Sequence, residues 1–145
     1  MFDSRLTRWI SQSVHKAFDS LSVQVLFENQ PKTRSKYSES IEVRIHGPNY
    51  RQVNGGWKIQ VFVNVLVTVR QENDIYAMEK ILGPVTNILA TSIVVQQYGV
   101  GESEDVVGCL RPAGRVETAN QGIFKTETKA LQATVENVFY MDIKE

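Results

Sequence analysis

Few residues in this chain have the types and spacing that catalysis or metal binding needs. The 145 residues include two histidines, His15 and His46, and one cysteine, Cys109. No His/Glu pair has metal-ligand spacing such as HExxH. A lone cysteine cannot form an internal disulfide, and a thiol in the middle of an expected strand is typically buried and inert. We expect no enzyme activity, no cofactor and no metal, with carboxylates brought together by folding as the one enzymatic alternative.

An acidic, glycine-rich turn is the first charged segment of interest. The sequence GVGESED (99–105) matches neither a P-loop nor a GxGxxG fingerprint, and it precedes a strand instead of a helix. Its carboxylates, Glu102, Glu104 and Asp105, fall short of an EF-hand ligand set. We expect a solvated turn, with a hard-cation site as the alternative.

A basic segment, residues 29–40, is the second charged segment of interest. It has no hydrophobic periodicity, and Lys32, Arg34 and Lys36 stand near Tyr37. A structureless stretch of this length inside a compact domain is usually functional or mobile. We expect a mobile, solvated loop. If identical loops met in a ring, Lys32, Arg34 and Lys36 would face the lumen and make non-specific contact with DNA.

The totals place these segments in one soluble-type domain covering residues 1–145. Sixteen basic residues balance sixteen acidic ones, so no global field attracts nucleic acid. The first 70 residues carry ten Lys/Arg and five Asp/Glu, and the remainder carry six and eleven. The charges either mix in space, or form two faces suited to head-to-tail packing of identical subunits. No run of about 18 apolar residues predicts a membrane span.

Hydrophobic periodicity predicts the elements that position these residues. Apolar residues recur at helical spacing from Phe2 to Leu21, with Asp3 or Ser4 as the cap, and again from residue 75 to 89, where Gly83-Pro84 predicts a kink or break. Alternation predicts strands at 23–27, 41–46, 57–70, 92–98, 106–112 and 130–143, with a loop-like stretch at 113–129. This order predicts an α+β fold: an antiparallel sheet with one very long strand and two helices on one face.

The very long strand, Trp57–Arg70, raises the question of what covers its second face. Its odd-numbered residues are apolar and are expected to face the helices. Asn54-Gly55 predicts a hairpin that pairs this strand with the strand at 41–46, with an extended loop between them. Phe62 and Leu66 lie on the opposite, mostly polar face. The C-terminal segment of the chain or a neighbouring subunit could cover them. We expect the second: a subunit interface that includes Phe62 and Leu66.

Taken together, these patterns resemble the tail terminator (tail completion) proteins of long-tailed bacteriophages. The resemblance rests on the helix LTRWISQSVHKAF, the strand ending RIHGP, the long strand WKIQVFVNVLVTVR and the following helix NDIYAMEKILGPV. From Gly99 onward only the last strand supports it.

The resemblance implies a structural virion protein of the tail or neck, assembled in the host cytoplasm. Such a protein forms a homomeric, hexameric ring that caps the tail tube and joins it to the connector or stopper protein of the head, without catalysis. Two alternatives stay open: another neck, head-completion or baseplate adaptor, or a non-catalytic cytoplasmic binding module.

Overall fold

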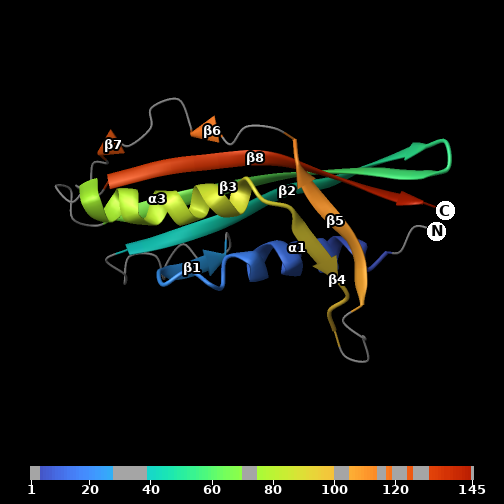
Figure 1. The fold of residues 1–145 in the computed structure, drawn as a ribbon, viewed down its shortest axis with the longest axis horizontal. Helices are drawn as coiled ribbons and strands as arrows, with labels where there is room; N and C mark the ends of the chain where they lie inside the picture. Colours follow the sequence, from blue (N-terminus) through green and yellow to red (C-terminus); the bar gives the residue numbers. More distant parts are fainter. Residues whose placement is uncertain are drawn as a thin grey trace.

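A computed structural model describes residues 4–27, 39–69, 75–99, 105–113, 117–118, 124–125 and 131–144. The described elements, in chain order, are α1 (Leu6–Ala17), β1 (Gln24–Phe27), β2 (Glu39–Val53), β3 (Gly56–Val69), α3 (Ile75–Leu89), β4 (Ile93–Gln96), β5 (Val106–Pro112), β6 (Glu117–Thr118), β7 (Phe124–Lys125) and β8 (Leu131–Lys144). The chain is therefore mixed α+β, with a curled sheet in the order β1-β2-β3-β8-β5-β4 and two helices among the described elements (Figure 1).

Three long antiparallel strands form the centre of the sheet. β2, β3 and β8 have 15, 14 and 14 residues, and Val65 of β3 stands opposite Val43 and Val135. The prediction of one very long strand was wrong in this respect. A central strand exposes N–H and C=O groups on both edges, so a strand this long needs neighbours of matching length to satisfy them.

The sheet is also not purely antiparallel. β1 runs parallel to β2, with Val25 opposite Ile41, and this pairing corrects the antiparallel prediction. Two-residue strands, β6 and β7, pair with β8 inside the stretch predicted as loop. Neither departure could be recognised from alternation, because alternation reports which face a side chain takes and not which strand lies beside it.

β2 continues past the point where the sequence predicted its end. The pairing with β3 shifts register between His46 and Asn49 and then resumes as far as Val53. Gly47 sits in this bulge with φ +98, and its peptide bond to Pro48 is cis. Gly55, at φ +89, closes the hairpin that Asn54-Gly55 predicted. Pro48 has no backbone N–H to donate to β3. Because it lies in the bulge, where the ladder is interrupted, the strand bends there and does not stop.

The helices differ from prediction at the start of α1 and at the proline of α3. α1 has Arg5 at its N-cap and no side-chain cap bond, so the predicted Ser4 cap is wrong, while Asp3 lies outside the described residues. α3 runs unbroken through Pro84, which corrects the predicted break. Gly83 and Pro84 are both exposed. On the solvent side, water can bond the carbonyl that proline leaves without its N–H partner.

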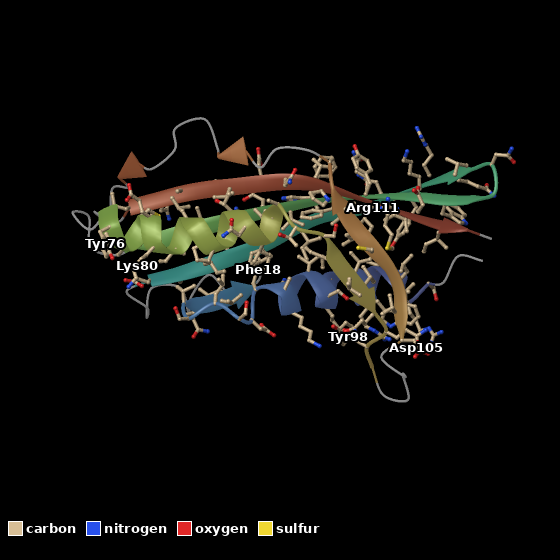
Figure 2. All side chains as sticks on the ribbon, in the orientation of Figure 1. Phe18, Tyr76, Lys80, Tyr98, Asp105 and Arg111 are labelled. Atoms are coloured by element: carbon tan, nitrogen blue, oxygen red, sulfur yellow. The ribbon has the colours of Figure 1, made fainter. Side chains whose placement is uncertain are left out.

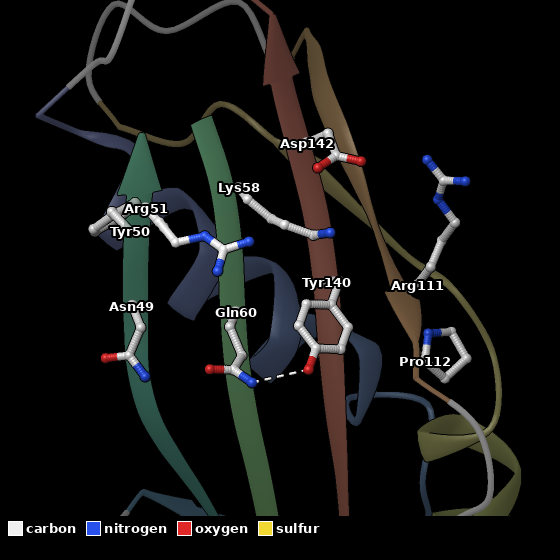
Figure 3. Close-up of a pocket in the computed structure, with 9 residues that line it drawn as sticks. All are labelled: Asn49, Tyr50, Arg51, Lys58, Gln60, Arg111, Pro112, Tyr140 and Asp142. Atoms are coloured by element: carbon white, nitrogen blue, oxygen red, sulfur yellow. Dashed lines mark hydrogen bonds between the residues drawn. The ribbon is translucent and has the colours of Figure 1, made fainter. Parts of the chain in front are cut away.

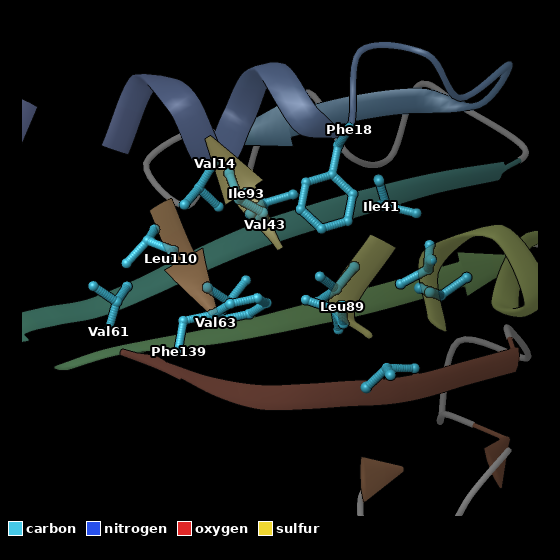
Figure 4. Packing of buried hydrophobic residues seen from close by; sticks show 14 of the residues in the cluster. Val14, Phe18, Ile41, Val43, Val61, Val63, Leu89, Ile93, Leu110 and Phe139 are labelled. Atoms are coloured by element: carbon cyan, nitrogen blue, oxygen red, sulfur yellow. The ribbon is translucent and has the colours of Figure 1, made fainter. Parts of the chain in front are cut away.

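One core joins both helices to the odd-numbered face of the long strands (Figure 4). α3 packs on β3 and β8, whereas α1 contacts β2 and β4. The sheet curls far enough for β4, two strands beyond β8, to reach α1 (Figure 1). There the backbone N–H of Gln96 donates to the Ser13 hydroxyl at 3.1 Å, and the Trp9 indole donates to the Tyr98 carbonyl at 3.1 Å. No helix in the described ranges is long and apolar enough to span a membrane.

The C-terminal end of α3 depends on a buried side chain of β8. A helix leaves its last four carbonyls without helical partners. Here the carbonyls of residues 86–88 accept bonds from Ala90 and Thr91, and the Leu89 carbonyl accepts one from the Asn137 amide at 2.9 Å. The Asn137 side-chain oxygen also accepts from the Val138 N–H at 2.8 Å. The polar residue that interrupts the apolar pattern of β8 thus completes a helix end.

Replacing Asn137 by leucine is expected to lower the free energy of unfolding by about 1–3 kcal/mol, because a buried carbonyl loses its donor. Urea denaturation of the parent and variant would measure the loss. Asn64→Leu makes the same change on the outer side of the neighbouring strand, where Asn64 bonds the exposed Glu136, and should cost less than half as much. Equal losses in the two variants would contradict this role of Asn137.

Candidate functional site

The candidate site lies on the outer face of the three long strands, opposite the helices. Register places the outward residues in cross-strand rows: Arg51, Lys58 and Asp142 form one row, and His46, Phe62 and Val138 form another. Between them lies the row of Asn49, Gln60 and Tyr140. Because the strands are paired over their whole length, these side chains stand on a rigid platform.

Phe62 is an exposed aromatic residue on the outer side of β3. It is 37% exposed, which is unusual for an aromatic side chain on the middle strand of a sheet. It borders a hollow of about 600 Å³ whose lining also includes His46, Val138 and Ala113. Glu136 and Asn64 are polar residues of the same lining. A large apolar side chain beside an open hollow marks a contact surface better than it marks a core.

Leu66, which the sequence grouped with Phe62, has a different environment. It is only half-buried, but its neighbour Glu42 is 3% exposed and Thr68 is 2% exposed. Arg44 bonds the Glu42 carboxylate at 2.8 Å. This end of the outer face is therefore largely covered within one chain. The structure brings Phe62 and Leu66 onto one face but leaves only Phe62 prominently exposed.

A second hollow, of about 680 Å³, lies on the same face nearer the hairpin end of β2 and β3 (Figure 3). The cationic side chains of Arg51, Lys58 and Arg111 line it, together with one carboxylate, Asp142. They come from β2, β3, β5 and β8, so four strands contribute. We call this set the basic hollow.

Neutral hydrogen-bonding groups complete the basic hollow. Asn49 and Gln60 present carboxamides, and the Gln60 amide donates to the Tyr140 hydroxyl at 2.9 Å (Figure 3). Tyr140 is 36% exposed. Tyr50 borders the hollow from the inner side, where it bonds Thr7 of α1. Burial raises the pKa of the Tyr50 hydroxyl, so this group stays protonated at neutral pH and serves as a structural contact.

The two histidines and the cysteine singled out in the sequence lie on three different elements. His46 lines the Phe62 hollow, whereas His15 lies on α1. Cys109 is half-buried on β5. Within the described ranges no three His, Cys, Asp or Glu side chains cluster as metal ligands would.

The two charged loops predicted from the sequence fall largely outside the structure's description. Lys32, Arg34 and Lys36 lie outside the described residues, as do Glu102 and Glu104. Asp105 is described and exposed beside β5 (Figure 2). The lumen-facing loop therefore stays a prediction. The basic hollow was missed by sequence reasoning, because its cations are single outward residues on separate strands.

Comparisons with known proteins identify no family. No protein-family model matches the chain, and no curated protein matches it. One solved structure superposes with a TM-score of 0.47 at 11% sequence identity, over 100% of this chain and 98% of the other. A likeness at this level carries no functional argument.

Proposed function

We propose that this chain is a structural virion protein of the tail terminator type. It forms a homomeric ring, hexameric as in the family it resembles, that caps the tail tube and joins it to the head connector or stopper protein. The chain acts in the tail or neck of the virion after assembly in the host cytoplasm. No catalytic residue, metal or cofactor takes part in this function.

The segments that carry the resemblance support the proposal by their order in space. α1 and α3 share one core with β3, and α3 follows β3 after a short connection. The strand that carries RIHGP pairs with β3 along its length. These features are consistent with the resemblance.

The observation that carries the assembly proposal is the exposure of Phe62. It lies on the outer face of β3, opposite His46 and Val138, with a hollow beside it. Aromatic residues in such positions are typical anchors of protein–protein interfaces. Leu66 extends the proposed interface at its partly covered edge. A second copy of the chain would bury both side chains.

Replacing Phe62 by aspartate is expected to convert the assembly to monomers, since a charge would be buried in the subunit interface. Light scattering coupled to size exclusion would measure the mass, and negative-stain images of the parent should show rings with a central hole. Leu66→Asp should weaken assembly in the same direction.

Tyr76→Asp is the matched control, because Tyr76 is 73% exposed on α3, away from the outer face (Figure 2). It should keep the parent mass. Circular dichroism would show that each variant is folded. An unchanged mass for folded Phe62→Asp would rule out this interface, and a parent that is monomeric at micromolar concentration would argue against the ring and favour a binding module.

A further inference from the structure

We propose that the basic hollow binds the phosphate backbone of a nucleic acid. The inference concerns the residues around Arg51, Lys58 and Arg111 and does not involve the loop that carries Lys32, Arg34 and Lys36. It does not depend on ring formation, so binding and assembly can each fail while the other holds.

The cations of the hollow have no anionic partner among the described residues. Asp142 stands directly opposite Lys58 in the register, yet the described ion pairs include none for Arg51, Lys58 or Arg111. All three side chains are exposed. Three cations around one carboxylate leave a local positive excess on a chain whose total charge is balanced. Such an excess attracts anions locally, within about one Debye length of 8–10 Å.

The spacing of the cations fits a chain of phosphates better than one phosphate ion. Arg51 lies on β2 and Arg111 on β5, three strand spacings apart in the order β2-β3-β8-β5. At about 4.8 Å per spacing, the strands are on the order of 14 Å apart. Side chains that extend outward from strands this far apart contact separate phosphates more readily than one shared phosphate. One nucleic acid strand, with a phosphate every ~3.4 Å along the helix axis, presents several phosphates over the same span.

The donors of the hollow match phosphate chemistry. Arginine guanidinium groups bind phosphate oxygens through two parallel N–H bonds, and lysine adds a point charge. The carboxamides of Asn49 and Gln60 and the hydroxyl of Tyr140 add neutral donors of the kind that contact sugar and phosphate. Every strand that contributes is paired, so the backbone positions that carry the donors are fixed before binding.

The polarity of the hollow distinguishes a nucleic acid from an acidic protein. Protein interfaces have an apolar centre with charges at the rim, whereas nucleic acid interfaces are polar and basic throughout. The lining of this hollow consists mainly of charged and amide side chains, together with Pro112 and two tyrosines, Tyr50 and Tyr140. The Phe62 hollow, further along the sheet, has Phe62, Val138 and Ala113 beside His46, Asn64 and Glu136, and no lysine or arginine lines it.

The test measures the salt dependence of DNA binding by the full chain. Fluorescence anisotropy with a labelled duplex of random sequence would give the affinity at several salt concentrations. In the double variant Arg51→Gln/Lys58→Gln, the slope of log affinity against log salt should fall by about 2, because each lost phosphate contact removes about 0.9. The control Lys16→Gln/Lys80→Gln removes the same charge from the helices and should leave the slope unchanged. Equal slopes in the two double variants would overturn the proposal.

Two further measurements separate nucleic acid from other anions. Asp142→Asn removes the one carboxylate in the hollow and should tighten DNA binding, which a purely structural role of Asp142 would not do. Poly-glutamate and unlabelled DNA would each be tested as competitors of the labelled duplex. If poly-glutamate displaced the duplex at a 10-fold lower concentration than unlabelled DNA, the hollow would be assigned to an acidic protein and the proposal would be overturned. Displacement by inorganic phosphate alone, at the same ionic strength set with chloride, would assign it to a single anion and would also overturn it.

Discussion

Phe139→Ala is expected to lower the free energy of unfolding by about 3–5 kcal/mol, the largest loss we expect from one side chain in this protein. Phe139 is fully buried on the inner face of β8. It stands opposite Val61 on one side and Pro112 on the other, close to Val63 and Leu110 (Figure 4). Three paired strands hold these neighbours in place, so they cannot collapse into the space that the ring leaves. The lost burial is therefore added to the cost of a cavity.

Tyr140→Ala is the control for this measurement. Tyr140 is the next residue of the same strand, has a similar volume and points to the outer face. Urea unfolding should show a loss for Tyr140→Ala of less than half that for Phe139→Ala. If the two losses were equal, the outer face would bury as much as the inner face, and the assignment of the core to one side of the sheet would be wrong.

Gly47→Ala is expected to lower the free energy of unfolding by roughly 2–5 kcal/mol. Two physical effects contribute. The φ of +98 at Gly47 is unfavourable for any residue with a Cβ, at about 1–2 kcal/mol. In addition, an added Cβ would lie 2.9 Å from the Asn49 nitrogen and 3.1 Å from the Gln60 carbonyl oxygen. Both contacts are to backbone atoms, so the bulge itself must shift, at a further cost of about 1–3 kcal/mol.

Gly55→Ala separates these two effects. Gly55 also has a positive φ, +89, but nothing lies within 4 Å of an added Cβ. This variant should show only the cost of the backbone conformation, and the difference between the variants measures the close approach at the bulge. Urea denaturation is the measurement for both. If Gly55→Ala lowered the free energy of unfolding as much as Gly47→Ala, the close contacts at the bulge would contribute nothing to the loss.

The bulge at Gly47 also links stability to the proposed functions. It lies between the row of His46 and Phe62 and the row of Asn49, Gln60 and Tyr140. Before the bulge the even-numbered residues of β2 point to the outer face. After it the odd-numbered residues do, so Asn49 and Arg51 join the outer rows. Without that change of parity, Arg51 would point to the helix side and the basic hollow would lack one of its cations. Variants at Gly47 should therefore be checked for DNA binding only where they remain folded.

Local patterns were sufficient for most of the elements. The strand at 106–112 and the helix ending at Leu89 occur where periodicity placed them, and the Asn54-Gly55 turn forms as predicted. The helices share one core with the odd-numbered face of β3, as its alternation indicated. These features depend on residues within a few positions of one another, so a single stretch of sequence contains the information that determines them.

Gly47-Pro48 shows the limit of such local signals. In isolation the dipeptide predicts the end of a strand. In the structure β3 continues to offer pairing partners past it, so the ladder resumes at Asn49 after one register shift. Pro84 in α3 shows the same limit. It lies on the exposed side of the helix, where water can bond the carbonyl left without a partner, so the helix continues without a break.

Only the tertiary structure determined which residues of the candidate site are exposed and which of them lie together. The sequence by itself determined that Phe62 and Leu66 face away from the helices, but strand pairing left Phe62 exposed and Leu66 partly covered. Arg51, Lys58 and Arg111 are isolated single charges along the chain, and they meet because β8 lies between β3 and β5. Strand order and register depend on contacts between residues far apart in sequence. Periodicity carries no information about such partners, and therefore none about the basic hollow.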